Sequence, residues 1–261
     1  MKKVFLAVAV IAGFTFMSCN DDDGPSGTTA RVELRLTDGP ADYEEVNVDI
    51  QEVIFKVSGG EDVVFPLDSA GVYNLLELSN GVDVLLGDNE LPVGEVSQIR
   101  LVLGENNTIK IDGTVYPLDT PSAQQSGLKL NVHYNLEPGM LYTIWLDFDA
   151  GKSIVERGDG TYGLKPVIKA FTELTNGRIE GTVLPSEAET TVYAMQNTVD
   201  TIGVAIPNPD GYFKFSGLDE GSYDLTFDAG NAAYQDQQLN GVQVVTGTVT
   251  NVGEITMVPV P

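Results

Sequence analysis

The stretch RVELRL, residues 31–36, alternates charged and apolar side chains at every step. Successive side chains of a strand point to opposite faces of a sheet, so a period of two predicts a half-buried β-strand. The same alternation recurs at residues 46–50, 98–103 and 108–111. From Ala30 onward no stretch has a convincing helical period, and the sequence therefore predicts an all-β protein.

Short turns separate these strands, and several contain a pair of residues that tolerates positive φ. The pairs are Gly59-Gly60, Asn80-Gly81, Asp112-Gly113, Asp159-Gly160 and Asp210-Gly211. Short strands with frequent turns are typical of a β-sandwich. Residues 79–90 are an exception, and we expect them to form a short helical turn or a loop across one end.

A tight turn of the pattern Leu-x-x-Gly begins at Leu91, Leu136 and Leu218, each time just before a new strand. Two of these turns precede residue 170 and one follows it, which favours two consecutive sandwiches over one. A strand ends at residue 171 and Asn176-Gly177 opens another. We therefore expect one domain over residues 30–173 and a second over residues 177–258.

The composition excludes several classes of protein. Acidic side chains number 38 against 14 basic ones, and the formal net charge is -24. A surface of this charge repels a phosphate backbone, so no nucleic acid is expected as a partner. The single cysteine excludes an internal disulfide framework, and the single histidine excludes sites that need two imidazoles.

The first residues have the pattern of an export signal. Lys2 and Lys3 precede an apolar run over residues 4–17, which is shorter than the roughly 20 residues that a membrane-spanning helix needs. Residues 16–19, FMSC, resemble the bacterial lipobox, which implies removal of residues 1–18 and acylation of Cys19. A plain secretory signal with an incidental cysteine is the alternative.

Residues 19–29 combine an acidic run with Gly, Pro, Ser and Thr, a composition typical of a flexible tether. An acidic run directly after the acylated cysteine also resembles the surface-export signal of Bacteroidetes lipoproteins. We therefore expect a lipid-anchored protein of the outer membrane, exposed at the cell surface rather than facing the periplasm. Its body would contact the membrane only through the lipid.

The C-terminal part contains the run DGYFKFSGLDEGSYDL, residues 210–225. With residues 177–183 it resembles the carboxypeptidase-regulatory-like domain of the transthyretin and starch-binding-like superfamily. The resemblance implies a seven-stranded Greek-key sandwich that serves as a non-catalytic module. It also implies that five residues are core and turn positions rather than a stacking platform: Phe213, Phe215, Leu218, Tyr223 and Leu225.

Five segments of the N-terminal part are distinctive: residues 36–48, 91–101, 120–129, 146–150 and 164–168. With them this part resembles the DUF4382 family, a domain of unknown function common in bacterial lipoproteins. The resemblance implies a β-sandwich over nearly all of residues 30–172. It implies no reaction, because the biochemical role of the family is not established.

No arrangement of catalytic residues is evident in the sequence. His133 is the only imidazole, stands at a polar position of a predicted strand, and is expected to be exposed surface. No Gly-x-Ser-x-Gly elbow surrounds a serine. Carboxylates are frequent, yet nothing in the sequence nominates a pair for glycoside hydrolysis.

The best candidate for a ligand site is acidic. Asp147 and Asp149 are expected on the same side of a strand, and Asp38, Asp42 and Glu44 are expected in a loop with Gly and Pro. Hard oxygen ligands of this kind suit calcium, although no stretch matches a calcium loop. Calcium is therefore a possible cofactor, and a plain wetted strand face is the alternative.

Other residues suggest contacts with sugars. Polar side chains at residues 122–126 form a loop next to Pro121 that could hydrogen-bond sugar hydroxyls, with Tyr142 and Trp145 nearby in sequence. Trp145 is more simply read as sandwich core. Ser69 and Thr201 lie in triplets that resemble the Bacteroidetes O-glycosylation acceptor motif.

These features favour a non-enzymatic envelope protein that acts as a binding or adhesion module, with carbohydrate as the first ligand class. The alternative is a structural or assembly component that binds envelope proteins through its sheet edges. An enzyme is the third hypothesis. Two nearby carboxyls with raised pKa in a deep cleft would favour it.

Overall fold

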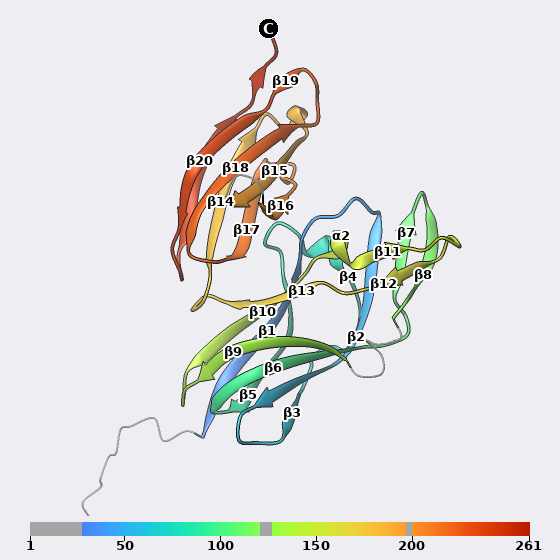
Figure 1. The fold of residues 1–261 in the computed structure, drawn as a ribbon, viewed down its shortest axis with the longest axis vertical. Helices are drawn as coiled ribbons and strands as arrows, with labels where there is room; N and C mark the ends of the chain where they lie inside the picture. The colour runs from blue at the N-terminus through green and yellow to red at the C-terminus, as the bar shows by residue number, and fades with distance from the viewer. Residues whose placement is uncertain (1–27, 121–126, 197–199) are drawn as a thin grey trace, which may run out of the picture.

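The computed structural model describes residues 28–120, 127–196 and 200–261 (Figure 1). Most of them lie in β-strands, so the all-β prediction is confirmed. The hydrophobic core falls into two clusters, one between Ala30 and Leu164 and one between Ile179 and Met257. We refer to residues 29–172 and 177–259 as the N-terminal and C-terminal units. The predicted signal, Cys19 and the polar loop at residues 122–126 lie outside the described residues.

The first sheet of the N-terminal unit is built around the stretch that alternates most regularly. Its four strands lie in the order β13 (Ile168–Thr172), β10 (Leu141–Phe148), β1 (Thr29–Asp38) and β5 (Val84–Pro92). β1 and β10 run parallel, whereas the other pairs are antiparallel. Val32, Leu34 and Leu36 of β1 are fully buried, as their alternation predicts.

The second sheet packs its apolar face against the first. It follows the order β11 (Ile154–Glu156), β12 (Tyr162–Leu164), β8 (Thr114–Asp119), β7 (Thr108–Ile111), β2 (Glu45–Val57), β6 (Gly94–Leu103) and β9 (Leu128–Leu136). β3 (Asp62–Phe65) and β4 (Gly71–Asn74) also pair with β2. The short helix α2 (Ala150–Ser153) follows β10 at the end of the sheet that faces the C-terminal unit.

Residues 79–90 depart from the sequence prediction. The helical turn η1 comes earlier, at Leu75–Leu78, and most of the predicted loop belongs to strand β5. Leu34 pairs with Gly87 but Arg35 pairs with Leu85, so the ladder between β1 and β5 contains a bulge. A bulge shifts the alternation of side chains by one residue, which hides the strand from a search for period two.

The C-terminal unit consists of a three-stranded and a four-stranded sheet. The first has the order β17 (Tyr212–Leu218), β14 (Gly177–Leu184), β21 (Val249–Thr256), and the second β16 (Asp200–Ala205), β15 (Thr190–Gln196), β18 (Gly221–Ala229), β20 (Gln237–Val244). The turn η2 (Ser186–Ala188) and the pair β19 (Tyr234–Gln235) and β22 (Val258–Pro259) complete it. The five residues predicted as core positions are buried: Phe213, Phe215, Leu218, Tyr223 and Leu225.

Candidate functional site

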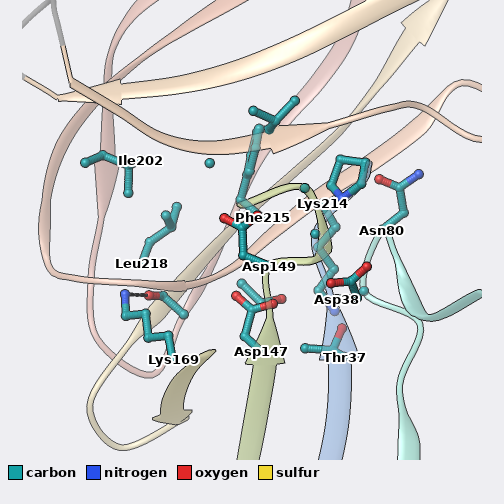
Figure 2. Close-up of a pocket in the computed structure, with 18 of the residues that line it drawn as sticks. Thr37, Asp38, Asn80, Asp147, Asp149, Lys169, Ile202, Lys214, Phe215 and Leu218 are labelled. Carbon is teal, nitrogen blue, oxygen red and sulfur yellow. Dashed lines mark hydrogen bonds between the residues drawn. The ribbon is translucent and has the colours of Figure 1, made fainter. Parts of the chain in front are cut away.

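A polar cleft of about 280 Å³ lies between the two units (Figure 2). The N-terminal unit contributes the ends of β1 and β10, helix α2 and the loop before β5, and the C-terminal unit contributes β16 and β17. Three carboxyls and three ammonium groups line it: Asp38, Asp147, Asp149, Lys152, Lys169 and Lys214. The cleft therefore combines both signs of charge with hydrogen-bonding groups from both units.

Asp38 is the last residue of strand β1, so its prediction as a loop residue was wrong. It is the most deeply buried carboxyl of the cleft, with 4% of its surface exposed. Its Oδ1 accepts the backbone N–H of Ala150 at 2.9 Å, and its Oδ2 has no hydrogen-bond partner among the described residues. Burial raises the pKa of Asp38 to about 8, and the charges of Asp147 and Asp149 contribute to the rise. Asp38 is therefore mostly protonated at pH 7.

Asp147 and Asp149 both line the cleft. The prediction that they share one strand was wrong, because only Asp147 lies in β10. Asp147 lies in β10, beside Thr37 in the parallel ladder, which places it next to the end of β1. Burial is the main cause that raises the pKa of Asp147 to about 7, and the charge of Asp149 raises it further. β10 ends at Phe148, and Asp149 caps α2 by accepting the N–H of Lys152 at 2.9 Å.

Four further polar residues of the cleft gave no functional signal in the sequence. Lys152 donates to Asp149 Oδ2 at 2.7 Å, and Lys169 donates to the carbonyl of Gly217 in the other unit at 2.6 Å. Burial lowers the pKa of Lys214, and the nearby guanidinium of Arg178 lowers it further. Asn80 was identified only as a turn residue, and its φ of 56° agrees with that prediction.

Asn80 links the two units and carries a second unpaired acceptor. Its Nδ2 donates to the carbonyl of Ile206 in the C-terminal unit. Its Oδ1 is buried and has no hydrogen-bond partner within the described ranges. Asp38 Oδ2 and Asn80 Oδ1 are therefore two buried oxygens that line one cleft and have no partner among the described residues. The amide oxygen of Asn80 needs a donor, whereas Asp38 Oδ2 donates while the carboxyl is protonated and accepts once it is ionised.

Trp145 belongs to the contact between the units, so its prediction as sandwich core was wrong. It is on the outer face of β10 and stacks on Phe171, with ring centroids 5.4 Å apart and planes at 8°. The guanidinium of Arg178 lies 5.1 Å from the Trp145 ring centre, and Trp145 Nε1 donates to Asp83 Oδ2 at 3.1 Å. The contact from Arg178 joins the two units beside the cleft, and Phe171 and Asp83 hold the Trp145 ring in place for it.

The remaining candidates lie away from the cleft. Asp42 is exposed and does not line it, and His133 is exposed on β9 as predicted. Tyr142 is buried and its hydroxyl accepts the N–H of Glu137, so it offers no stacking surface. Ser69 is exposed in a loop, whereas Thr201 is exposed within strand β16 rather than in the expected loop. O-glycosylation of either residue stays a prediction.

The geometry gives calcium no support. Although three carboxyls line the cleft, the described part of the chain holds no group of three or more His, Cys, Asp or Glu side chains that could bind a metal ion. Lys152 pairs with Asp149, and the charges of Lys169 and Lys152 also act on Asp147. The arrangement instead suits an organic ligand that brings hydrogen-bond donors.

The fold and the cleft define an all-β protein with two sandwich units and a polar cavity between them. The family model described as "Domain of unknown function (DUF4382)" matches residues 29–166, and the chain belongs to this family. The matched segment includes Asp38, Asn80, Asp147 and Asp149. A search of the curated proteins finds no match.

Solved structures similar to this chain contain β-sandwich modules. A chain of a type II cohesin–X-dockerin complex from Acetivibrio cellulolyticus matches at 20% identity, with a TM-score of 0.25. The match covers 31% of this chain and 56% of the cohesin–X-dockerin chain. GBS52, the minor pilin of Streptococcus agalactiae, matches at 10% identity over 88% of this chain and 96% of its own, with a TM-score of 0.26. A fimbrial protein from Bacteroides ovatus matches at 7% identity over 88% of this chain and 50% of its own, with a TM-score of 0.28. At these scores the likeness carries no argument about function.

Across residues 28–120, 127–196 and 200–261, no helix has the length and apolar character needed to cross a membrane.

Proposed function

We propose that this chain is a non-enzymatic, lipid-anchored protein of the outer membrane, exposed at the cell surface, whose two sandwich domains bind a carbohydrate in the cleft between them. The anchor is the lipid on Cys19, after removal of residues 1–18. The acidic tether that follows holds the sandwiches away from the membrane.

The observation that carries the proposal is the pair of buried oxygens without a partner among the described residues, Asp38 Oδ2 and Asn80 Oδ1, on one cleft. A sugar hydroxyl both donates and accepts, so sugar hydroxyls can pair with the Asn80 oxygen and with Asp38 in either protonation state. Ile202 lines the opposite side and offers exposed apolar surface to the C–H face of a sugar ring. A cavity of about 280 Å³ is near the lower end of the usual range for ligand pockets. It suits one sugar residue, such as a chain end or side branch.

A panel of host and plant polysaccharides tests the proposal. The mature protein without Cys19 is incubated with each glycan in calcium and again in chelator. Saturable binding to at least one glycan in both conditions is the expected result. Binding that disappears in chelator would indicate that calcium takes part in glycan binding. No binding to any glycan would overturn the carbohydrate assignment in favour of protein partners.

The raised pKa values favour a second candidate function, hydrolysis of a glycoside. At pH 7 Asp38 is mostly protonated and Asp147 is about half ionised. One protonated and one ionised carboxyl are the requirement for general acid and base catalysis. Release of new reducing ends from any bound glycan, lost in Asp147→Asn, would establish this function in place of simple binding.

A further inference from the structure

A second cavity, of about 360 Å³, lies in the C-terminal unit and shares no described lining residue with the cleft between the units. Two turns form most of it, residues 185–190 between β14 and β15 and residues 206–211 between β16 and β17. Each turn crosses from one sheet of the unit to the other, and the antiparallel pairing of β14 with β17 places both turns at the same end. The cavity, which we call the end pocket, therefore lies at one end of the sandwich.

One buried hydroxyl points into the sandwich at this end. Thr190 is 7% exposed and shares the buried face of β15 with Val192 and Ala194, so its side chain points between the two sheets. Val183, from the opposite sheet, lines the same pocket. Thr190 Oγ1 has no hydrogen-bond partner among the described residues. Because an unpaired buried hydroxyl is costly, the pocket favours a ligand that brings a hydrogen-bonding group to it.

The other walls of the end pocket are mainly apolar, and they consist of Val183, Pro185, Ile206, Pro207 and Pro209. The remaining polar side chains of the described lining, Ser186, Glu189 and Asn208, are exposed, and among them only Glu189 is charged. A sugar ring carries a hydroxyl on most of its carbons, and these walls would leave most of those hydroxyls unpaired. A purely aliphatic ligand would leave Thr190 unpaired. The pocket therefore fits a neutral, largely apolar ligand with one hydrogen-bonding group.

We propose that the end pocket binds a phenol, an aromatic ring with one hydroxyl group, which packs on the proline rings and pairs with Thr190 Oγ1. Proline and aromatic rings pack well against each other in protein recognition. A phenol hydroxyl both donates and accepts, as does the threonine hydroxyl, so the two pair without a further partner. A free phenol and the tyrosine side chain of a partner protein share this chemistry. The site is separate from the cleft, so the inference does not rest on glycan binding.

Matched ligands test the inference. The soluble mature protein without Cys19 is titrated with p-cresol and with toluene, which has the same methyl-substituted ring without the hydroxyl. Binding is followed through the backbone amide signals in NMR spectra. We expect p-cresol to shift the signals of Thr190 and Gly211, which line the end pocket, and to leave those of Asp38 and Asp147 in the cleft unchanged. Shifts centred on the cleft, or no shifts at all, would overturn the inference.

Two threonine variants localise the hydrogen bond. Thr190→Val replaces the buried hydroxyl by a methyl group, and Thr191→Val makes the same change at a half-buried residue of β15 that does not line the pocket. The preference for p-cresol over toluene, taken as the ratio of their dissociation constants, should fall about tenfold in Thr190→Val and stay at the wild-type value in Thr191→Val. An unchanged preference in Thr190→Val, or an equal fall in both variants, would overturn the inference.

Urea unfolding checks the observation on which the inference depends. If Thr190 Oγ1 has no partner in the free protein, Thr190→Val should be at least as stable as the wild type. A clear loss of stability would show that the hydroxyl already has a partner, such as a bound water, and would overturn the inference.

The tripeptide Gly-Tyr-Gly identifies the source of the ring. Binding of the tripeptide as tight as that of p-cresol would support a tyrosine of a partner protein as the ligand. Binding of p-cresol alone would support a free phenol.

Discussion

The substitution Asp38→Asn is expected to stabilise the protein at neutral pH. In the folded state the pKa of Asp38 is raised from 3.8 to about 8 by burial, whereas the unfolded chain has the ordinary value. Between these values the folded state holds a proton that the unfolded state has released. Stability therefore falls as the pH rises from about 4 to about 8, and it does not change further above pH 8.

The size of the effect follows from the shift. Each pKa unit corresponds to about 1.4 kcal/mol, and pH 7 lies about three units above the pKa of Asp38 in the unfolded chain. Asp38 therefore lowers the free energy of unfolding at pH 7 by about 4 kcal/mol. At pH 4 the cost is close to zero, because the carboxyl is largely protonated in both states. Asparagine keeps an oxygen that accepts the Ala150 N–H and cannot ionise.

Urea unfolding at pH 4 and pH 7, followed through the fluorescence of Trp145, measures this difference. Asp38→Asn should gain several kcal/mol in free energy of unfolding at pH 7 and little at pH 4, and Asp42→Asn should change it by less than about 0.5 kcal/mol at either pH. The burial argument for Asp38 is refuted if the variant is equally destabilised at both pH values.

Three further substitutions test the packing. Gly217→Ala should lower the free energy of unfolding by about 2 kcal/mol and alter the contact between the units, because φ is +67° and the new Cβ would lie 2.7 Å from the ring of Phe171. An unchanged free energy of unfolding in urea would contradict this. Asp49→Ala should cost about 2 kcal/mol in the same assay, since the buried carboxylate accepts both the backbone and side-chain N–H of Asn106. Phe227→Ala should cost about 3–5 kcal/mol and speed hydrogen exchange chiefly in the C-terminal unit, whereas uniform acceleration across both units would show that they unfold together.

Local alternation of side chains predicted the strands well. Residues 31–36, 46–50, 98–103 and 108–111 all lie in strands, because a sheet with one buried face imposes period two on its sequence. The prediction failed at β5, where the bulge at Leu85–Gly87 shifts the period. It also gave no hint that β1 pairs in parallel with β10, since that pairing joins residues more than 100 positions apart.

The candidate site was only half predictable for the same reason. Asp38, Asp147 and Asp149 stood out as an acidic group, and the parallel ladder brings the first two together. Asn80 and Lys169 had no such signal, because their roles arise from contacts with the C-terminal unit. Trp145 was misread because its strand alternates regularly, and nothing local indicates that its outer face meets a second unit.

Hydrogen–deuterium exchange with the tightest-binding glycan from the panel tests the central claim most directly. Binding between the units should slow exchange at residues 37–40, 147–152, 202–204 and 214–218, which line the cleft from both sides. The β7–β8 hairpin, which lies apart from the cleft, serves as an internal control. Protection confined to one unit, or centred on the hairpin, would contradict a ligand site between the two sandwiches.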